Sequence, residues 1–304
     1  RMEKIFIKLL TMLLTVSFIF NSLPLVAVAG ESKQLGSADM AVTANRQATA
    51  IAEISTKRTS DSKTFLMSDG TYLNAVYPEQ VHFYENGKWQ DYDNTLQEIA
   101  ADTSERSERN HVDLTNRYAD FSVRFSKKLN GKKFVRFEKS GYKISWYYTN
   151  ARKITAQMKE ITSSEDITVL NKLNSVILYE NVYNKTDFEY IVDSNGVKEN
   201  IILKDNNAPA EFEAVYKANG LNQLDPTTIA IQTDNGENVY ILSAPYMEDS
   251  KGEISCNVQM TITSQKNNSF CIRITLDEKW LLASDRAYPV TVDPLLQTSQ
   301  DWND

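Results

Sequence analysis

The chain has few of the residues that build metal sites and nucleophile-based active sites. Its 304 residues include only two His and two Cys. Most zinc and haem sites need several such ligands close together, so these counts exclude most of them. The sequence also lacks the Gly-x-Ser-x-Gly, His-Glu-x-x-His, Cys-x-x-Cys, P-loop and Gly-x-Gly-x-x-Gly patterns. We therefore predict no catalytic residue, no metal site, no cofactor and no enzymatic activity.

An excess of basic residues is missing too. Lys and Arg total 33 against 40 Asp and Glu, which gives a formal net charge of -7. Gripping a phosphate backbone needs clustered positive charge, so we expect no nucleic-acid partner. The chain does have 41% hydrophobic and 10% aromatic residues, enough for a core, which excludes wholesale disorder. The length allows one large β domain or two ordinary ones.

The N-terminus has the order of a secretory signal. Basic residues precede the apolar run Leu9–Phe20, and the small residues Ala27–Ala29 follow it. A membrane anchor is the alternative, but the run is shorter than the roughly 20 residues that span a bilayer. We predict that residues 1–29 are a signal peptide and that the mature protein begins near Gly30. The protein is then secreted or at the cell surface.

A linker and a series of hairpins follow. Residues 30–56 have no aromatic side chain and predict a flexible linker, in which Thr43–Ile54 could form a weak helix. Beyond it, six of the ten Gly follow Asn or Asp, the pairs that suit tight turns. These pairs are Asp69-Gly70, Asn86-Gly87, Asn130-Gly131, Asn195-Gly196, Asn219-Gly220 and Asn235-Gly236.

Alternating apolar and polar residues surround these turns. Residues 81–85 and 88–92 flank Asn86-Gly87, and residues 254–262 and 270–276 alternate in the same way. The pattern predicts an all-β fold of antiparallel hairpins, as a β-sandwich or an extended β stack.

The sequence also predicts how this fold is divided. We assign residues 57–294 to an all-β domain, with a division into two halves near 150–174 as an option, and residues 295–304 to the start of a linker. Residues 100–116 and 162–174 read as connections, and residues 151–160 as a helix or one more strand.

The cysteines are predicted to be free thiols. Cys256 falls on the apolar face of its expected strand and Cys271 on the polar face of the next. The two side chains should therefore point apart, whereas a disulfide needs Cα atoms within about 7 Å and side chains that face each other. His82, between two apolar residues, is expected to be a sheet residue, and His111 lies in a polar loop with no cluster around it.

Two further groups could bind ligands but have plainer interpretations. Asp91, Asp93 and Asn94 suggest oxygen ligands for calcium, although the rest of a calcium loop is missing and a solvated turn is favoured. An aromatic cluster could stack on a sugar, but three of its members share one face of a strand, which favours a place in the core. This cluster comprises Tyr142, Trp146, Tyr147 and Tyr148.

Four segments together resemble a known family. They are residues 57–96, residues 195–203, residues 244–252 and residues 286–294. Their order and spacing are similar to the N-terminal region of large secreted bacterial wall-associated proteins that carry DNRLRE domains and RHS (YD) repeats. The resemblance implies a cell-wall or extracellular location and a β-rich, non-catalytic segment that serves presentation or assembly. Its partners would be downstream modules of the same polypeptide, and cell-wall or surface glycans are a further option.

Two other functions stay open from the sequence. One is a free-standing extracellular adhesin or carbohydrate-binding module. The other, which the sequence favours less, is an extracellular hydrolase whose site uses acids and Tyr. The 40 acidic residues always offer carboxylate pairs, and for that reason no particular pair is singled out.

Overall fold

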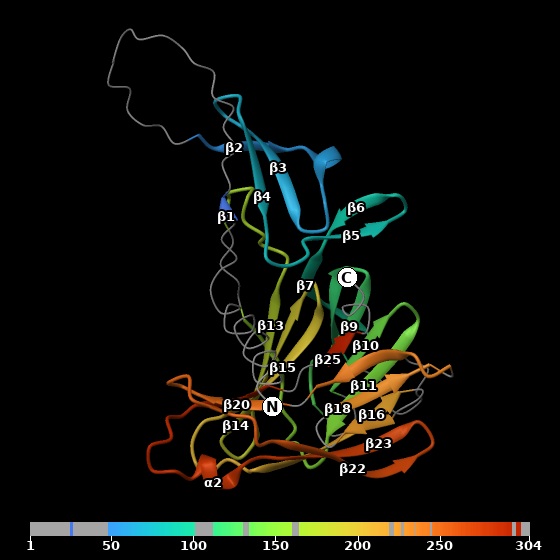
Figure 1. Ribbon diagram of the computed structural model, residues 1–304, viewed down its shortest axis with the longest axis vertical. Helices are drawn as coiled ribbons and strands as arrows, with labels where there is room; N and C mark the ends of the chain where they lie inside the picture. The colour runs from blue at the N-terminus through green and yellow to red at the C-terminus, as the bar shows by residue number, and fades with distance from the viewer. Residues whose placement is uncertain are drawn as a thin grey trace. The chain divides into compact units, whose positions relative to one another are not determined.

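The computed structural model is almost entirely antiparallel β, which confirms the predicted fold class (Figure 1). The chain divides into two compact units, residues 1–91 with 162–171 and residues 92–161 with 172–304. No helix among the residues that the structure describes is long and apolar enough to cross a membrane. The described residues are 25–26, 48–100, 112–129, 134–159, 164–218, 222–225, 228–233, 235–243, 245–293 and 296–298.

The first unit holds a four-stranded sheet and a separate hairpin. The sheet has the order β1-β4-β3-β2, and the hairpin joins β5 to β6. The elements are β1 (Leu25–Val26), β2 (Ala50–Glu53), η2 (Ser55–Lys57), β3 (Ser62–Met67), β4 (Tyr72–Val76), β5 (His82–Glu85) and β6 (Lys88–Asp91).

Strand β2 corrects part of the sequence interpretation. Residues 50–53 were expected in a flexible linker with a weak helix, yet they pair antiparallel with β3, from Ala50 opposite Met67 to Glu53 opposite Phe65. Pairing with a neighbouring strand overrides the weak local preference of an Ala-rich segment. The short β1 falls within the predicted signal peptide and pairs with β4.

The turn predicted at Asn86-Gly87 is confirmed. It joins β5 to β6, with Glu85 paired to Lys88 across the loop. Asn86 and Gly87 have φ values of 50° and 78°, the two positive values that a type I′ turn requires. Asn tolerates this conformation and Gly adopts it without steric cost.

The second unit is built mainly from two large sheets. The eight-stranded sheet has the order β22-β23-β16-β11-β10-β9-β8-β7. Its strands are β7 (Asp93–Ala100), β8 (Val112–Tyr118), β9 (Phe121–Ser126), β10 (Val135–Lys139), β11 (Tyr142–Tyr148), β16 (Glu211–Ala218), β22 (Gln259–Lys266) and β23 (Ser269–Thr275).

The seven-stranded sheet has the order β12-β13-β14-β15-β24-β20-β21. Its strands are β12 (Gln157–Lys159), β13 (Ser175–Tyr183), β14 (Thr186–Asp193), β15 (Gly196–Leu203), β20 (Tyr246–Asp249), β21 (Ile254–Ser255) and β24 (Val290–Asp293). A further sheet has the order β17-β18-β19-β25, formed by β17 (Asn222–Asp225), β18 (Thr228–Gln232), β19 (Asn238–Leu242) and β25 (Leu296–Thr298). Strand β25 lies in the segment expected to start a linker.

Aromatic side chains join the two large sheets into a sandwich. The rings of Tyr148 on β11 and Phe188 on β14 meet edge to face with centroids 4.5 Å apart. Phe125 on β9 lies 5.3 Å from Tyr190 on β14, and Phe134 lies 5.3 Å from Tyr179 on β13. Because each pair takes one ring from each sheet or its edge, the core of this unit is the layer between the sheets.

Residues 254–262 were expected to form one strand, and that expectation is wrong. Ile254 and Ser255 form β21, which pairs with β20 in the seven-stranded sheet. Strand β22 begins only at Gln259 and pairs with β23 in the eight-stranded sheet. The chain passes from one sheet to the other between them, and this crossing leaves Cys256 exposed rather than on an apolar face. A continuous alternation cannot reveal that a strand changes its partner sheet.

Two other connections differ from expectation, and residues 151–160 take the strand form that was one of their two options. The expected loop 100–116 is shorter, because β7 extends to Ala100 and β8 begins at Val112, and His111 lies outside the described residues. Within 151–160, residues 157–159 form β12. A short helix that the sequence pattern did not predict, α2 (Glu278–Leu281), follows Asp277, whose side chain accepts a hydrogen bond from the Trp280 backbone N–H.

One predicted turn is displaced by a residue. The loop between β14 and β15 is Ser194-Asn195, and Gly196 is already paired with Asp193. Gly196 has a φ of 131°, and a Cβ atom there would lie 3.2 Å from Cζ of Phe137. Gly196 is therefore needed for the close approach of β15 to the facing sheet. The pairs Asn130-Gly131 and Asn219-Gly220 lie outside the described residues.

Replacing Gly87 tests the hairpin of the first unit. A Cβ at Gly87 would meet no atom within 4 Å, so Gly87→Val acts only through the strain of a positive φ. We expect a loss of about 1–3 kcal/mol in unfolding free energy, because a β-branched residue is strained there. Asn86→Gly should be nearly neutral. Denaturant midpoints measure both, and equal midpoints for the two variants would contradict this hairpin geometry.

Candidate functional site: buried charges and a basic sheet face

A charged group, Glu199 in the middle of β15, is enclosed in the core of the second unit. It is 5% exposed, and its side chain lies in the aromatic layer between the two large sheets. Trp146 of the facing sheet donates an indole N–H to Oε2 at 2.9 Å, and Tyr148 donates its hydroxyl to Oε1. Burial raises the pKa of Glu199, while these hydrogen bonds favour the charged form and oppose that rise. The carboxyl group thus links the two sheets across the core.

A second network of charges lies in the first unit. The guanidinium of Arg58 forms a two-pronged pair with Glu53, at 2.6 Å from Nε and 2.9 Å from Nη2. The same Nη2 lies 2.7 Å from Asp91 on β6, and Lys63 on β3 also pairs with Asp91. Arg58 therefore joins the edge of the four-stranded sheet to the β5–β6 hairpin.

His82 lies beneath this network as a fully buried residue of β5, which confirms the expectation of a sheet residue. Its Nδ1 lies 2.6 Å from the carbonyl oxygen of Thr59, and its Nε2 lies 3.4 Å from Asp91. Partial burial opposes the ionisation of Asp91. Even so, interactions with His82, Lys63 and Arg58 hold the pKa of Asp91 well below its ordinary value. The carboxylate is therefore engaged by cations of its own unit.

A third network joins β20 to the segment before β24. The Arg286 guanidinium donates to Asp249 at 2.7 Å and stacks 3.4 Å above the ring of Trp280. The backbone N–H groups of Glu253, Lys251 and Ala287 also donate to the Asp249 carboxylate. Desolvation opposes ionisation, but these donors outweigh it and lower the pKa of Asp249 to about 2.

The calcium ligands considered from the sequence have other partners. Asp91 belongs to the network around Arg58, and Asp93 lies 3.5 Å from Lys172. Asn94 is fully buried and donates to the carbonyl oxygen of Leu173 at 2.7 Å. Among the residues that the structure describes, no group of three or more His, Cys, Asp or Glu side chains is placed to hold a metal ion.

The aromatic cluster and the cysteines are placed as follows. Trp146 and Tyr148 are 4% and 0% exposed, so their predicted place in the core is confirmed. The same prediction is wrong for Tyr142, at the start of β11, which is 45% exposed because the core covers only the later part of that strand. Cys256 and Cys271 are not bonded to each other.

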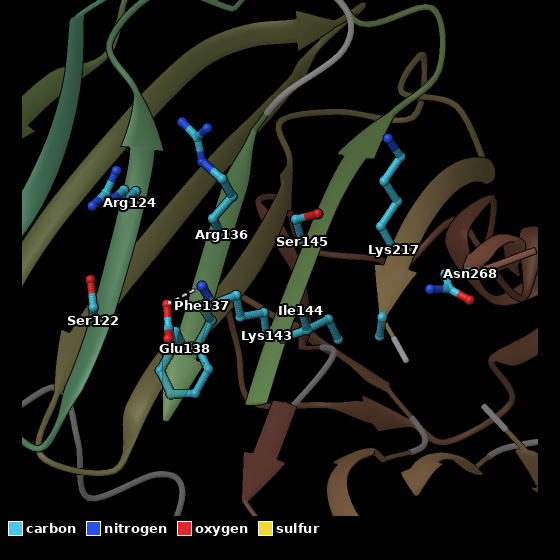
Figure 2. A pocket seen from close by; sticks show the side chains of 11 residues that line it. Ser122, Arg124, Arg136, Phe137, Glu138, Lys143, Ile144, Ser145, Lys217 and Asn268 are labelled. Atoms are coloured by element: carbon cyan, nitrogen blue, oxygen red, sulfur yellow. Dashed lines mark ion pairs between the residues drawn. The ribbon is translucent and has the colours of Figure 1, made fainter. Parts of the chain in front are cut away.

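The outer face of the eight-stranded sheet carries a line of cations that we call the basic row. It comprises Arg124, Arg136, Lys217 and Lys266. Strand pairing sets Arg124 opposite Arg136, then Ser145, Lys217, Ser269 and Lys266 in successive register. Figure 2 shows Arg124 and Arg136 extending from neighbouring strands and Lys217 from a strand beyond the one that carries Ser145.

An open hollow of about 530 Å³ lies over the first part of the basic row. Its polar lining includes the hydroxyls of Ser122 and Ser145 and the side chain of Asn268, and Lys143 and Glu138 form an ion pair of 3.4 Å at its edge. The sequence count of charges missed this face, because residues that are far apart in the chain meet only through strand pairing. An acidic total can therefore coexist with a basic surface.

The chain is similar to three nucleases and one wall protein. It is 25% identical over 253 residues to "tRNA nuclease WapA" of Bacillus subtilis (strain 168), which covers 80% of this chain and 10% of the relative. The figures are the same for "tRNA3(Ser)-specific nuclease WapA" of Bacillus spizizenii. "Wall-associated protein" of Geobacillus stearothermophilus is 25% identical over 221 residues, 68% of this chain and 82% of that protein.

The chain thus spans about a tenth of the length of the nuclease relatives. No family model matches it, and no solved structure matches it. The similarity confirms the wall-associated part of the resemblance and the expected extracellular or cell-surface location. The DNRLRE and RHS parts of that resemblance stay predictions.

Two expectations from the sequence are corrected by these names. The prediction of no enzymatic activity and the prediction of no nucleic-acid partner are both contradicted, because three relatives are named as nucleases that act on tRNA. Both predictions were drawn from absences, namely the missing motifs and the missing basic excess. Missing motifs do not exclude an activity that a relative has, and an acidic total does not exclude a basic patch on the surface.

Glu199 should make stability depend on pH. Its pKa is raised in the folded state above the usual 4.5, so the folded state binds more protons. The unfolding free energy of the wild type should therefore fall as the pH rises from about 4.5 through the folded-state pKa. Glu199→Gln should flatten this part of the profile, whereas Glu199→Ala should cost about 2–4 kcal/mol by leaving buried donors unpaired. Urea unfolding between pH 4 and 8 measures both.

The exposed Glu237 supplies the control for this measurement. Glu237→Gln removes the same charge from the surface and should keep the wild-type profile. If the Glu199→Gln profile matches that of the wild type instead, the buried carboxyl group does not carry the pH dependence.

Replacing Arg58 by lysine should weaken the network in the first unit. Arg58→Lys keeps the charge but cannot form the two-pronged pair with Glu53 while reaching Asp91, so we expect a loss of about 1–2 kcal/mol. Faster amide hydrogen exchange in β3 and β5 would report this loss locally. The same substitution at the exposed Arg152 should leave exchange unchanged. Equal exchange in the Arg58→Lys variant and the wild type would mean that the network contributes little.

Proposed function

We propose that this chain is a β-rich segment of a secreted, wall-associated bacterial polypeptide of the RHS-repeat type, in which it serves presentation or assembly of other modules of the same polypeptide. The observation that carries the proposal is the structural role of the four segments that resemble wall-associated proteins. Each contributes to a charged group that holds the fold together: Arg58 and Asp91, Glu199, Asp249, and Arg286. Residues with this role suit a scaffold.

The surroundings of the scaffold follow from the same proposal. Residues 1–29 act as a signal peptide. Residues 57–294 form the all-β region, and the DNRLRE and RHS modules lie elsewhere in the polypeptide. Residues 295–304 begin the linker toward those modules. The nuclease names of three relatives make tRNA cleavage the activity to assay in the whole polypeptide. In this view, the segment holds such a polypeptide at the cell wall.

A reporter fusion tests the proposal. A fluorescent protein joined after Asp304 and secreted from a Gram-positive host should be found mainly in the wall fraction. The control carries residues 1–30 and the reporter alone and should be found in the medium. Quantitative fluorescence of washed walls and culture medium measures the partition. An equal partition of the two fusions would count against a wall-holding segment.

A further inference from the structure

The basic row places like charges directly opposite each other. Arg124 on β9 faces Arg136 on β10 in register, an arrangement that destabilises a sheet unless something offsets it. The repulsion is partly offset at Arg136, because its guanidinium pairs with the buried carboxylate of Asp113 on β8. Arg124 and Lys217 form no ion pair with any described residue. On the part of this face that the structure describes, Arg124 and Lys217 therefore carry positive charge that no acidic side chain neutralises.

The acidic groups near the basic row are occupied elsewhere. Glu138 pairs with Lys143 at 3.4 Å. Glu211 and Glu213, further along β16 from Lys217, both lie within ion-pair distance of Arg273, at 3.4 and 3.6 Å. The excess of cations is therefore local to the row and its hollow.

The spacing of the cations fits an extended anionic polymer. Neighbouring strands lie about 4.8 Å apart, so the row presents a cation at roughly every one to two strands, about 5–10 Å, along a line across the sheet. A single small anion would need cations that converge on one point. A chain of phosphodiesters lying across the strands would instead meet successive cations, with the hydroxyls of Ser122 and Ser145 as further donors.

The face offers little for the recognition of bases. Binding of single-stranded nucleic acid relies on exposed aromatic rings on which bases stack. The ring in the lining of the hollow, Phe137, is 2% exposed and packs on Tyr240 in the core. Trp146 and Tyr216 also point inward, and Tyr147 lies on the outer face but does not line the hollow. These placements favour a polymer without bases.

We propose that the basic row binds an extended phosphodiester polymer without bases, of the polyol phosphate type. The cations neutralise successive phosphates, and the hydroxyls of Ser122 and Ser145 contact phosphate or polyol oxygens. The inference rests on the proposed wall association for the place where such a polymer is met. It adds the chemistry of the partner and the residues that bind it.

Salt-dependent binding of the full chain tests the proposal. Fluorescently labelled poly(glycerol phosphate) is titrated at several NaCl concentrations with the wild type and with Arg124→Gln/Lys217→Gln. Each phosphate contact contributes roughly 0.7 to the slope of log K against log salt for a single-stranded polyanion. Loss of two cations should therefore lower the slope by roughly 1.4 and weaken binding at least tenfold at low salt.

A matched control removes two charges outside the row. Lys251→Gln/Lys279→Gln makes the same change in net charge at exposed positions and should change the affinity less than twofold. Denaturant midpoints check that both double variants are folded, and relief of the facing cations should leave the row variant at least as stable as the wild type. An equal loss of affinity in both variants would overturn the proposal, as would the absence of wild-type binding.

A parallel titration with RNA distinguishes a polyol phosphate ligand from a nucleic-acid ligand. Poly(U) RNA of matched charge should bind no more tightly than poly(glycerol phosphate), and tenfold tighter binding of the RNA would overturn the proposal in favour of a nucleic-acid surface. The outcomes also separate this proposal from the proposed function. Wall retention of the reporter without polymer binding would remove only the basic-row proposal, whereas polymer binding without wall retention would remove only the wall-holding role.

Discussion

The hydrogen bonds from Trp146 and Tyr148 to Glu199 are the constraint on which the larger unit depends. A carboxyl group in an aromatic layer is costly unless its oxygens have donors, and both donors come from the opposite sheet. Aromatic packing alone would allow the two sheets to slide relative to each other, since ring contacts are only weakly directional. The carboxyl group fixes one register, because any shift of either sheet would leave buried polar atoms without partners.

The same logic recurs at the other charged groups. Arg58 connects a sheet edge to a hairpin, and Arg286 connects α2 to the strand that contains Asp249. In each case, a largely buried guanidinium pairs with a carboxylate from a distant part of the chain, Asp91 for Arg58 and Asp249 for Arg286. Two of the four segments behind the resemblance meet in this way, since Arg286 of residues 286–294 pairs with Asp249 of residues 244–252.

Local patterns in the sequence predicted what depends on local geometry. The turn at Asn86-Gly87 and the alternation in 270–276 were readable because φ preferences and the two-residue period are properties of short segments. The pairing of β2, the break between β21 and β22 and the role of Gly196 depend on which strand lies alongside, and no short pattern encodes that. The candidate site was invisible for the same reason, since Glu199 looks like any polar residue of a strand and the basic row exists only once six strands are in register.

The passage of the chain between the two large sheets has a mechanical consequence. From β20 the chain leaves the seven-stranded sheet through β21, runs through β22 and β23 of the eight-stranded sheet, and returns as β24 between β15 and β20. The two sheets are thus connected covalently by one continuous segment of chain, residues 246–293. Separating the two layers would therefore require stripping either β23 from β16 or β24 from β15 and β20, in addition to opening the aromatic layer between the sheets.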